Sequence, residues 1–197
     1  MTNQTQPLEE PAMIVQPDVD AVVVGAGFTG LYMMHRLRQE GITARGFDAA
    51  PDVGGTWYWN RYPGARCDIE SMQYSFQFDE DLQQEWRWTE RYASQPEILA
   101  YIGHVADRFD LRRDFTFDTR VEAATFDKAS HTWMVETGGG EKIRTRYFIM
   151  GVGCLSAPLR PTFKGEVNYK GEVYQTSLWP KDPVDFTGPP RLCRTFF

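Results

Sequence analysis

Residues 19–48 read VDAVVVGAGFTGLYMMHRLRQEGITARGFD, and this stretch decides the fold. The run Val19–Val24 is almost entirely apolar, which is typical of a strand buried on both faces. A glycine-rich turn follows at once, and apolar residues then recur at helical spacing until Gly41, which can end a helix. A second short strand, 42–47, precedes Asp48. The pattern predicts a βαβ unit at the start of a doubly wound α/β domain.

The turn GAGFTG matches the phosphate-binding pattern GxGxxG between a strand and a helix. Gly25 permits the tight turn, Gly27 lets the backbone approach a pyrophosphate, and Gly30 lets the helix pack closely on the strand. The N-terminus of the helix then offers free N–H groups to the phosphates. Asp48, at the end of the second strand, can accept hydrogen bonds from ribose hydroxyls and would repel a 2′-phosphate. The site is therefore expected to hold FAD or NAD rather than NADP.

A second glycine pair, Gly54 and Gly55, follows Asp48 closely. The combination of GxGxxG, an acid and GG resembles the adenine-dinucleotide fingerprint of two-dinucleotide flavoproteins. Simple NAD dehydrogenases do not need the second pair, so FAD is favoured over NAD as the ligand. An NAD dehydrogenase remains the weaker alternative.

The rest of the chain predicts one more helix and a group of strands. Ser94 and Glu97 have the spacing of a capping box, and four apolar residues follow at helical spacing as expected core positions: Ile98, Ile102, Val105 and Phe109. Three short segments separated by turn residues predict a β-meander within about 115–149, with Trp133 packing on one face: 120–126, 132–137 and 142–148.

Composition sets the class of protein. The 197 residues are 42% hydrophobic and 24% charged, which excludes disorder over most of the length. No apolar run is long enough to span a bilayer, residues 1–17 read as a flexible polar arm rather than a signal peptide, and a net charge of −6 opposes non-specific nucleic-acid binding. Three widely spaced cysteines indicate reduced thiols in a cytoplasmic protein. No residue spacing suggests a metal site, and nothing fixes the oligomeric state.

The stretch 54–71, GGTWYWNRYPGARCDIES, resembles the type I Baeyer–Villiger monooxygenases, a branch of the class B flavin monooxygenases. The similarity extends through QEWRWTERYASQPEILAYI, VADRFDLR and GVGCLSAP, and is nearest to the phenylacetone, steroid and cyclohexanone monooxygenase kind. The resemblance implies a Rossmann-like FAD-binding domain with an inserted β-meander over 18–157, then a linker over 158–188 towards an NADPH domain. Residues 189–197 depart from the family pattern as a divergent tail.

The resemblance also implies the activity: an enzyme that uses FAD, NADPH and O₂ to convert a small ketone into an ester or lactone. Gly25, Gly27, Thr29 and Gly30 would hold the FAD pyrophosphate, and Asp48 the adenosine ribose. The remaining residues that would contact FAD lie along the chain after the second glycine pair: Gly55, Thr56, Trp57, Tyr58, Trp59, Tyr74 and Val121. Which ketone would be oxidised is not implied.

A turn centred on Pro63 and Gly64 would carry three residues towards the flavin and the nicotinamide: Arg66, Cys67 and Asp68. In the family the aspartate at the position of Asp68 interacts with an arginine that stabilises negative charge during oxygen insertion. Asp68 is therefore the expected catalytic residue, held as a buried carboxylate near an arginine. Its alternative role is to cap a turn.

The family signature FxGxxxHxxxWP aligns with YKGEVYQTSLWP, where Gln175 replaces the histidine. Glutamine cannot titrate, so coupling between NADPH and flavin is in doubt. The NADPH domain and the catalytic arginine would follow the last residue, so we expect a truncated chain that retains FAD weakly or not at all and is inactive alone. Two alternatives stay open: a non-catalytic FAD- or NAD-binding module, and a heteroatom-oxidising flavin monooxygenase.

Overall fold

The computed structural model describes residues 15–160, 162–187 and 192–194. Most of the expected N-terminal arm and most of the divergent tail lie outside these residues. Six strands form one sheet in the order β3-β2-β1-β6-β5-β4. The strands are β1 (Val19–Val24), β2 (Ala44–Phe47), β3 (Phe115–Thr116), β4 (Val121–Asp127), β5 (Thr132–Thr137) and β6 (Lys142–Met150).

The sheet is mixed. β1 pairs in parallel with both β2 and β6, and β2 pairs in parallel with β3. β5 pairs antiparallel with β4 and β6, which forms the expected β-meander. The meander is continuous with the parallel sheet rather than separate from it, because β6 pairs with β5 in its first half and with β1 in its second half. The predicted α/β fold class is confirmed.

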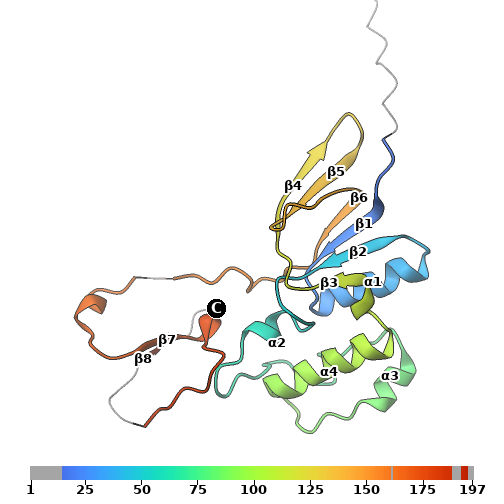
Figure 1. Ribbon diagram of the computed structural model, residues 1–197. Helices are drawn as coiled ribbons and strands as arrows, with labels where there is room; N and C mark the ends of the chain where they lie inside the picture. Colours follow the sequence, from blue (N-terminus) through green and yellow to red (C-terminus); the bar gives the residue numbers. More distant parts are fainter. Residues whose placement is uncertain (1–14, 161, 188–191, 195–197) are drawn as a thin grey trace, which may run out of the picture.

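Helices cover one face of the sheet (Figure 1). They are α1 (Phe28–Gln39), the short α2 (Thr56–Trp59), α3 (Glu80–Glu85) and α4 (Gln95–Arg108). On β1, Ala21 and Val23 pack with α1 and α4, whereas Val22 packs on the other face with Phe47 of β2. Period-two alternation with both faces buried is the pattern that the apolar run of β1 predicts. Trp133 packs on that second face, with its ring 5.4 Å from the Phe148 ring.

Two local predictions are wrong. The expected capping box does not form: the Ser94 side chain makes no cap bond, and Glu97 Oε1 accepts the Thr89 N–H at 2.7 Å. The carboxylate is therefore used to hold the preceding loop rather than the N-cap. The second strand begins later than predicted because Ile42 N–H donates to the Leu37 carbonyl at the end of α1. Of the expected core positions of α4, Ile98, Ile102 and Val105 are fully buried, and Phe109 packs against them half-buried.

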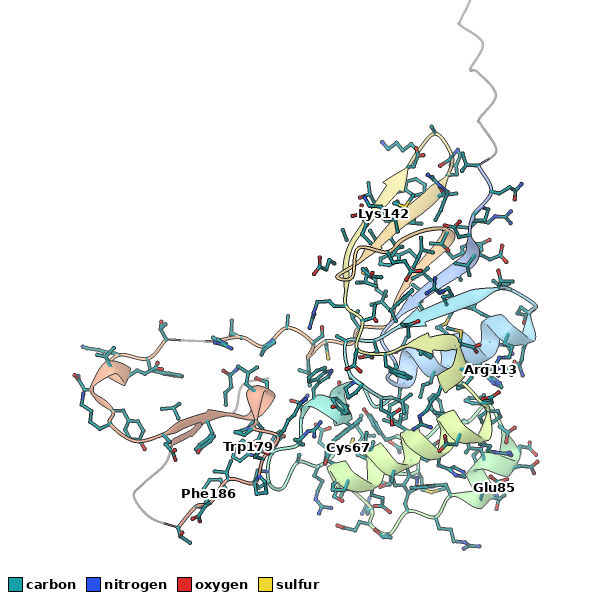
Figure 2. All side chains as sticks on the ribbon, in the orientation of Figure 1. Cys67, Glu85, Arg113, Lys142, Trp179 and Phe186 are labelled. Atoms are coloured by element: carbon teal, nitrogen blue, oxygen red, sulfur yellow. The ribbon has the colours of Figure 1, made fainter. Side chains whose placement is uncertain are left out.

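The chain leaves the sheet after β6 and forms an extended arm over residues 158–160 and 162–187, which loops outward and then returns beside α2 (Figure 1). The arm contains β7 (Val173–Gln175), which pairs in parallel with β8 (Leu192–Arg194). Many apolar side chains of the arm are exposed, including Leu159 and Val167. The rings of Trp179 and Phe186 stack on each other, with 6.0 Å between their centroids (Figure 2). No helix in the described part of the chain is both long and apolar enough to cross a membrane.

Candidate functional site

The glycine-rich turn after β1 leaves no room for a side chain at Gly25 or Gly30. Gly25 has φ +101°, and a Cβ atom there would lie 2.5 Å from the Gly151 carbonyl oxygen. A Cβ atom on Gly30 would lie 1.7 Å from the Gly25 carbonyl oxygen. Both positions therefore require glycine, and the turn lets α1 begin directly beside the end of β1. The first N–H groups of α1 have no partner within the helix and form a positive end.

The second glycine pair packs against the first turn. Gly54 N–H donates to the Ala26 carbonyl at 3.0 Å. Gly55 has φ +52°, and a Cβ atom there would lie 2.8 Å from the Gly27 Cα. We call this contact between Gly27 and Gly55 the glycine interlock. Because of it, two loops far apart in the sequence meet backbone to backbone beside the N-terminus of α1.

Asp48 ties the end of β2 to the same turn. Its carboxylate is buried and accepts two backbone N–H groups, from Ala26 at 2.5 Å and from Ala50 at 2.7 Å. Each carboxylate oxygen has a second lone pair, so Asp48 can still accept hydrogen bonds from a ligand hydroxyl. The side chain thus combines a structural role with an acceptor next to the glycine-rich turn.

These features border a cleft of about 460 Å³ at the carboxyl ends of β1, β2 and β6. Ligands of doubly wound domains bind at this edge of the sheet. The cleft brings together seven of the residues that the sequence analysis singled out: Gly25, Gly27, Asp48, Gly55, Thr56, Trp59 and Val121. Asp48 is the one acidic residue and Arg120 the one basic residue among its described lining residues.

Several expected ligand contacts lie outside the cleft lining. Trp57 is buried in the core, and its Nε1–H donates to the Tyr74 hydroxyl at 3.0 Å with the two rings edge to face. Burial raises the pKa of Tyr74. Tyr58 is half-buried under the Arg61 guanidinium, which lies 4.6 Å from the ring centroid. In the first turn of α1, Thr29 is exposed and Gly30 is buried below the turn.

The predicted turn at Pro63 and Gly64 forms. Ala65 N–H donates to the Tyr62 carbonyl at 3.0 Å, and Gly64 has φ +78°, as a type II turn requires. After the turn the three expected site residues diverge in their surroundings.

Arg66 forms an ion pair with Glu90 and none with Asp68. Cys67 is buried near α2 and α4, and this burial raises the pKa of its thiol (Figure 2). Asp68 is exposed, whereas the sequence analysis expected a buried carboxylate. The Cys67 side chain packs into the core, and the next residue, Asp68, faces solvent.

The cleft also contains residues that the sequence analysis did not select. Gly151 lies at the end of β6, where a Cβ atom would be 3.1 Å from the Val24 carbonyl oxygen, and it is followed by Val152 and Leu155. The stretch GVGC in the sequence could have indicated Gly151 as a site residue. From the arm, Ser177 and Leu178 reach the cleft, and Gln175 Nε2 donates to Ser177 Oγ at 2.8 Å and to the Leu159 carbonyl at 2.7 Å. No cluster of metal-ligating side chains occurs among the described residues.

Known proteins are similar to this chain in sequence and in structure. The NAD(P)-binding Rossmann-like domain family matches residues 23–87, the segment that holds both glycine motifs. A Baeyer–Villiger monooxygenase of Pseudooceanicola batsensis is 49% identical over 173 residues, which cover 87% of this chain and 32% of the relative. Phenazine N-monooxygenase of Lysobacter antibioticus is 44% identical over 164 residues, which cover 83% of this chain and 30% of the relative.

Solved structures of similar proteins share this fold. A steroid monooxygenase bound to NADP superposes with a TM-score of 0.79 at 55% identity, covering 86% of this chain and 33% of that one. A complex of OTEMO with FAD and NADP also gives a TM-score of 0.79, at 43% identity, covering 86% and 32%. The resemblance to Baeyer–Villiger monooxygenases is confirmed. The chain spans about a third of the length of the relatives it matches.

Proposed function

We propose that this chain provides the FAD-binding part of a Baeyer–Villiger-type monooxygenase that uses FAD and NADPH. The observation that carries the proposal is the glycine interlock. It joins the Gly55 loop to the N-terminus of α1, where the hydrogen bond from Ala26 N–H also holds Asp48, so that a phosphate and a ribose can be bound side by side at the mouth of one cleft. The similarity to a complex that contains both FAD and NADP supports the choice of cofactors.

The residues present fit FAD in the cleft. We assign its pyrophosphate to the Gly25–Gly27 turn and the first turn of α1 with Thr29 and Gly30, and its adenosine ribose to Asp48. The part of the cleft towards which the flavin would extend is bordered by Gly55, Thr56 and Trp59. The remaining proposed contacts are of two kinds. Val121 would contact the adenosine, and three aromatic residues lie behind the residues that line the cleft: Trp57, Tyr58 and Tyr74.

The proposed reaction is the insertion of one oxygen atom of O₂ into a small ketone, which gives an ester or lactone, while the second atom leaves as water. When bound, FAD would pass the two electrons of NADPH to O₂. The chain's own contribution is to bind the cofactor and to exclude water from this edge of the sheet.

We assign the catalytic position on this chain to Asp68, with Arg66 and Cys67 beside it. The Asp68 carboxylate is exposed and therefore free to pair with an arginine. Such an arginine would come from the two thirds of the relatives' length that this chain does not cover. In the complete enzyme Asp68→Ala should depress oxygen insertion much more than FAD binding, measured as product formed per NADPH consumed. Equal loss of FAD would show that the residue is structural instead.

The cysteines and the net charge bear on the location and the partners of the protein. The free thiols of Cys67 and Cys154 support a cytoplasmic protein, and an overall acidic charge opposes a nucleic-acid partner. We assign residues 18–157 to the FAD-binding domain and 158–188 to a linker towards an NADPH domain.

The proposal is tested by titrating the purified chain with FAD, FMN and NADP⁺ and following flavin fluorescence or heat. We expect weak, saturable one-to-one binding of FAD, with FMN and NADP⁺ bound more weakly because each misses one of the two contacts. The proposal fails if FAD does not bind, or if NADP⁺ binds as tightly as FAD.

One observation favours a second candidate, oxidation of a ring nitrogen. The phenazine N-monooxygenase is similar over nearly the same length as the Baeyer–Villiger enzyme, so overall sequence similarity does not separate the two chemistries. Mass spectrometry of the product formed by the complete enzyme decides between them, as an ester or lactone in one case and an N-oxide in the other. FAD binding without either product would indicate a non-catalytic module.

A further inference from the structure

The cleft has a direction that follows from the order of the strands. Along the edge of the sheet, the segment after β3 comes first, then Asp48 after β2, then the Gly25–Gly27 turn after β1, and finally Gly151 after β6. A dinucleotide with its phosphates at the turn and its ribose at Asp48 therefore extends its base further along the edge. That direction ends at the segment after β3.

Backbone hydrogen bonds hold this segment against the end of β2. Asp118 N–H donates to the Ala50 carbonyl and Thr119 N–H to the Asp48 carbonyl, both at 2.9 Å. Asp118 has φ +50°, a left-handed conformation that aspartate tolerates better than most residues. The chain bends there, and the next three residues line the cleft: Thr119, Arg120 and Val121.

Arg120 stands out among the side chains of the cleft. It is exposed, and within the described ranges its guanidinium has no ion pair, hydrogen bond or ring contact. Its main chain is nevertheless fixed, since its carbonyl accepts the Gly138 N–H at 2.8 Å. A planar cation with a held backbone and a free head is suited to stack on an aromatic base.

We propose that Arg120 is a cofactor-positioning residue whose guanidinium stacks on the adenine ring of FAD. The inference rests on the proposed function and adds a basis for choosing a dinucleotide over FMN. Binding of a 2′-phosphate by Arg120 is disfavoured because Asp48, whose carboxylate is buried and fixed by Ala26 and Ala50, lies at the ribose position and would repel it.

The test compares Arg120→Gln and Arg120→Lys with a matched control, Arg113→Gln. Arg113 is an exposed arginine outside the cleft lining that pairs with Asp110 at 2.9 Å (Figure 2). Each variant of the full chain is titrated with FAD and with FMN, which has no adenosine. Arg120→Gln should weaken FAD binding about 3- to 30-fold and leave FMN binding unchanged.

Arg120→Lys should restore only part of this loss, because an ammonium group keeps the charge but not the plane. Arg113→Gln should bind FAD like the wild type. Thermal midpoints of all variants should agree, since both side chains are exposed.

Three outcomes overturn the assignment. Wild-type FAD affinity in Arg120→Gln removes the role of Arg120 and leaves the proposed function intact. Full recovery in Arg120→Lys together with equal losses for FAD and FMN would show a charge contact with phosphate instead of stacking. Failure of the wild-type chain to bind FAD refutes the proposed function, and this inference with it.

Discussion

The glycine motifs and the aromatic stretch after them are adjacent in the sequence but end in different places. Gly25, Gly27 and Gly55 border the cleft, and the backbones of Gly27 and Gly55 touch. Of the aromatic residues that follow, Trp59 reaches the cleft, whereas Trp57 lies in the core bonded to Tyr74. One region is determined by where backbones must meet, and the other by which rings the core can accommodate.

This difference shows which site residues a motif can locate. A glycine forced by a positive φ or a close approach has one place it can occupy, so the pattern predicts its position. An aromatic side chain gains from burial in a core and from contact with a ligand alike, and its motif does not distinguish the two. The two regions should therefore differ in energy as they do in geometry.

The largest effect is expected at Gly30. In Gly30→Ala the new Cβ atom would collide with the Gly25 carbonyl oxygen, which belongs to backbone that cannot move without opening the turn. We expect the free energy of unfolding to fall by about 3 kcal/mol or more. Urea denaturation followed by circular dichroism measures it. Gly139→Ala, where the nearest atom would be 3.9 Å from the Cβ, should behave like the wild type.

Asp48→Ala should come next, because it leaves the buried N–H groups of Ala26 and Ala50 without their acceptor. The expected loss of unfolding free energy is about 2–4 kcal/mol. Asp68→Ala, which removes an exposed carboxylate, should change it by less than about 0.5 kcal/mol. Similar losses in the two variants would contradict the structural role given to Asp48.

In the aromatic region, Trp57→Phe removes the hydrogen bond from Nε1 to Tyr74 and leaves a gap in the core. A loss of about 1–2 kcal/mol is expected in the same denaturation experiment. Trp59→Phe should cost less than about 0.5 kcal/mol, since the Trp59 side chain is 42% exposed, but should weaken FAD binding. The reverse order would place Trp57 at the ligand and Trp59 in the core.

The smallest effect is expected outside both regions at His35 on α1, whose ring lies beside those of Phe78 and Phe109. Burial, aided by Arg38 and Arg36, lowers its pKa below the usual 6.5. The unfolded chain then binds the proton more readily, so the contribution to stability is present above pH 6.5 and is lost as the pH falls below it.

Unfolding free energies at pH 5 and pH 7.5 should therefore differ less in His35→Gln than in the wild type. His131→Asn, at an exposed position outside the helices, should preserve the wild-type difference. An unchanged difference in His35→Gln would show that other groups cause the pH dependence.

Features that backbone geometry requires could be predicted from the sequence. The βαβ unit, the β-meander and the turn at Gly64 all form, and the second strand of the βαβ unit begins two residues later than predicted. Contacts that depend on the folded neighbours could not be predicted. The Glu97 carboxylate is bound by Thr89 instead of the N-cap, and Arg120 reaches the cleft only because Asp118 turns the chain there. No local pattern carries such information, since the partners come from distant segments.

The glycine interlock also has a consequence for how the protein folds. Gly27 and Gly55 lie on either side of α1 and β2 in the sequence, so their contact closes a loop that contains both elements. Closing that loop costs entropy that must be met by burying α1 and β2 on the sheet. The N-terminal end of α1 is thus complete only while the whole βαβ unit is folded, so a dinucleotide that binds there would stabilise this unit as a whole.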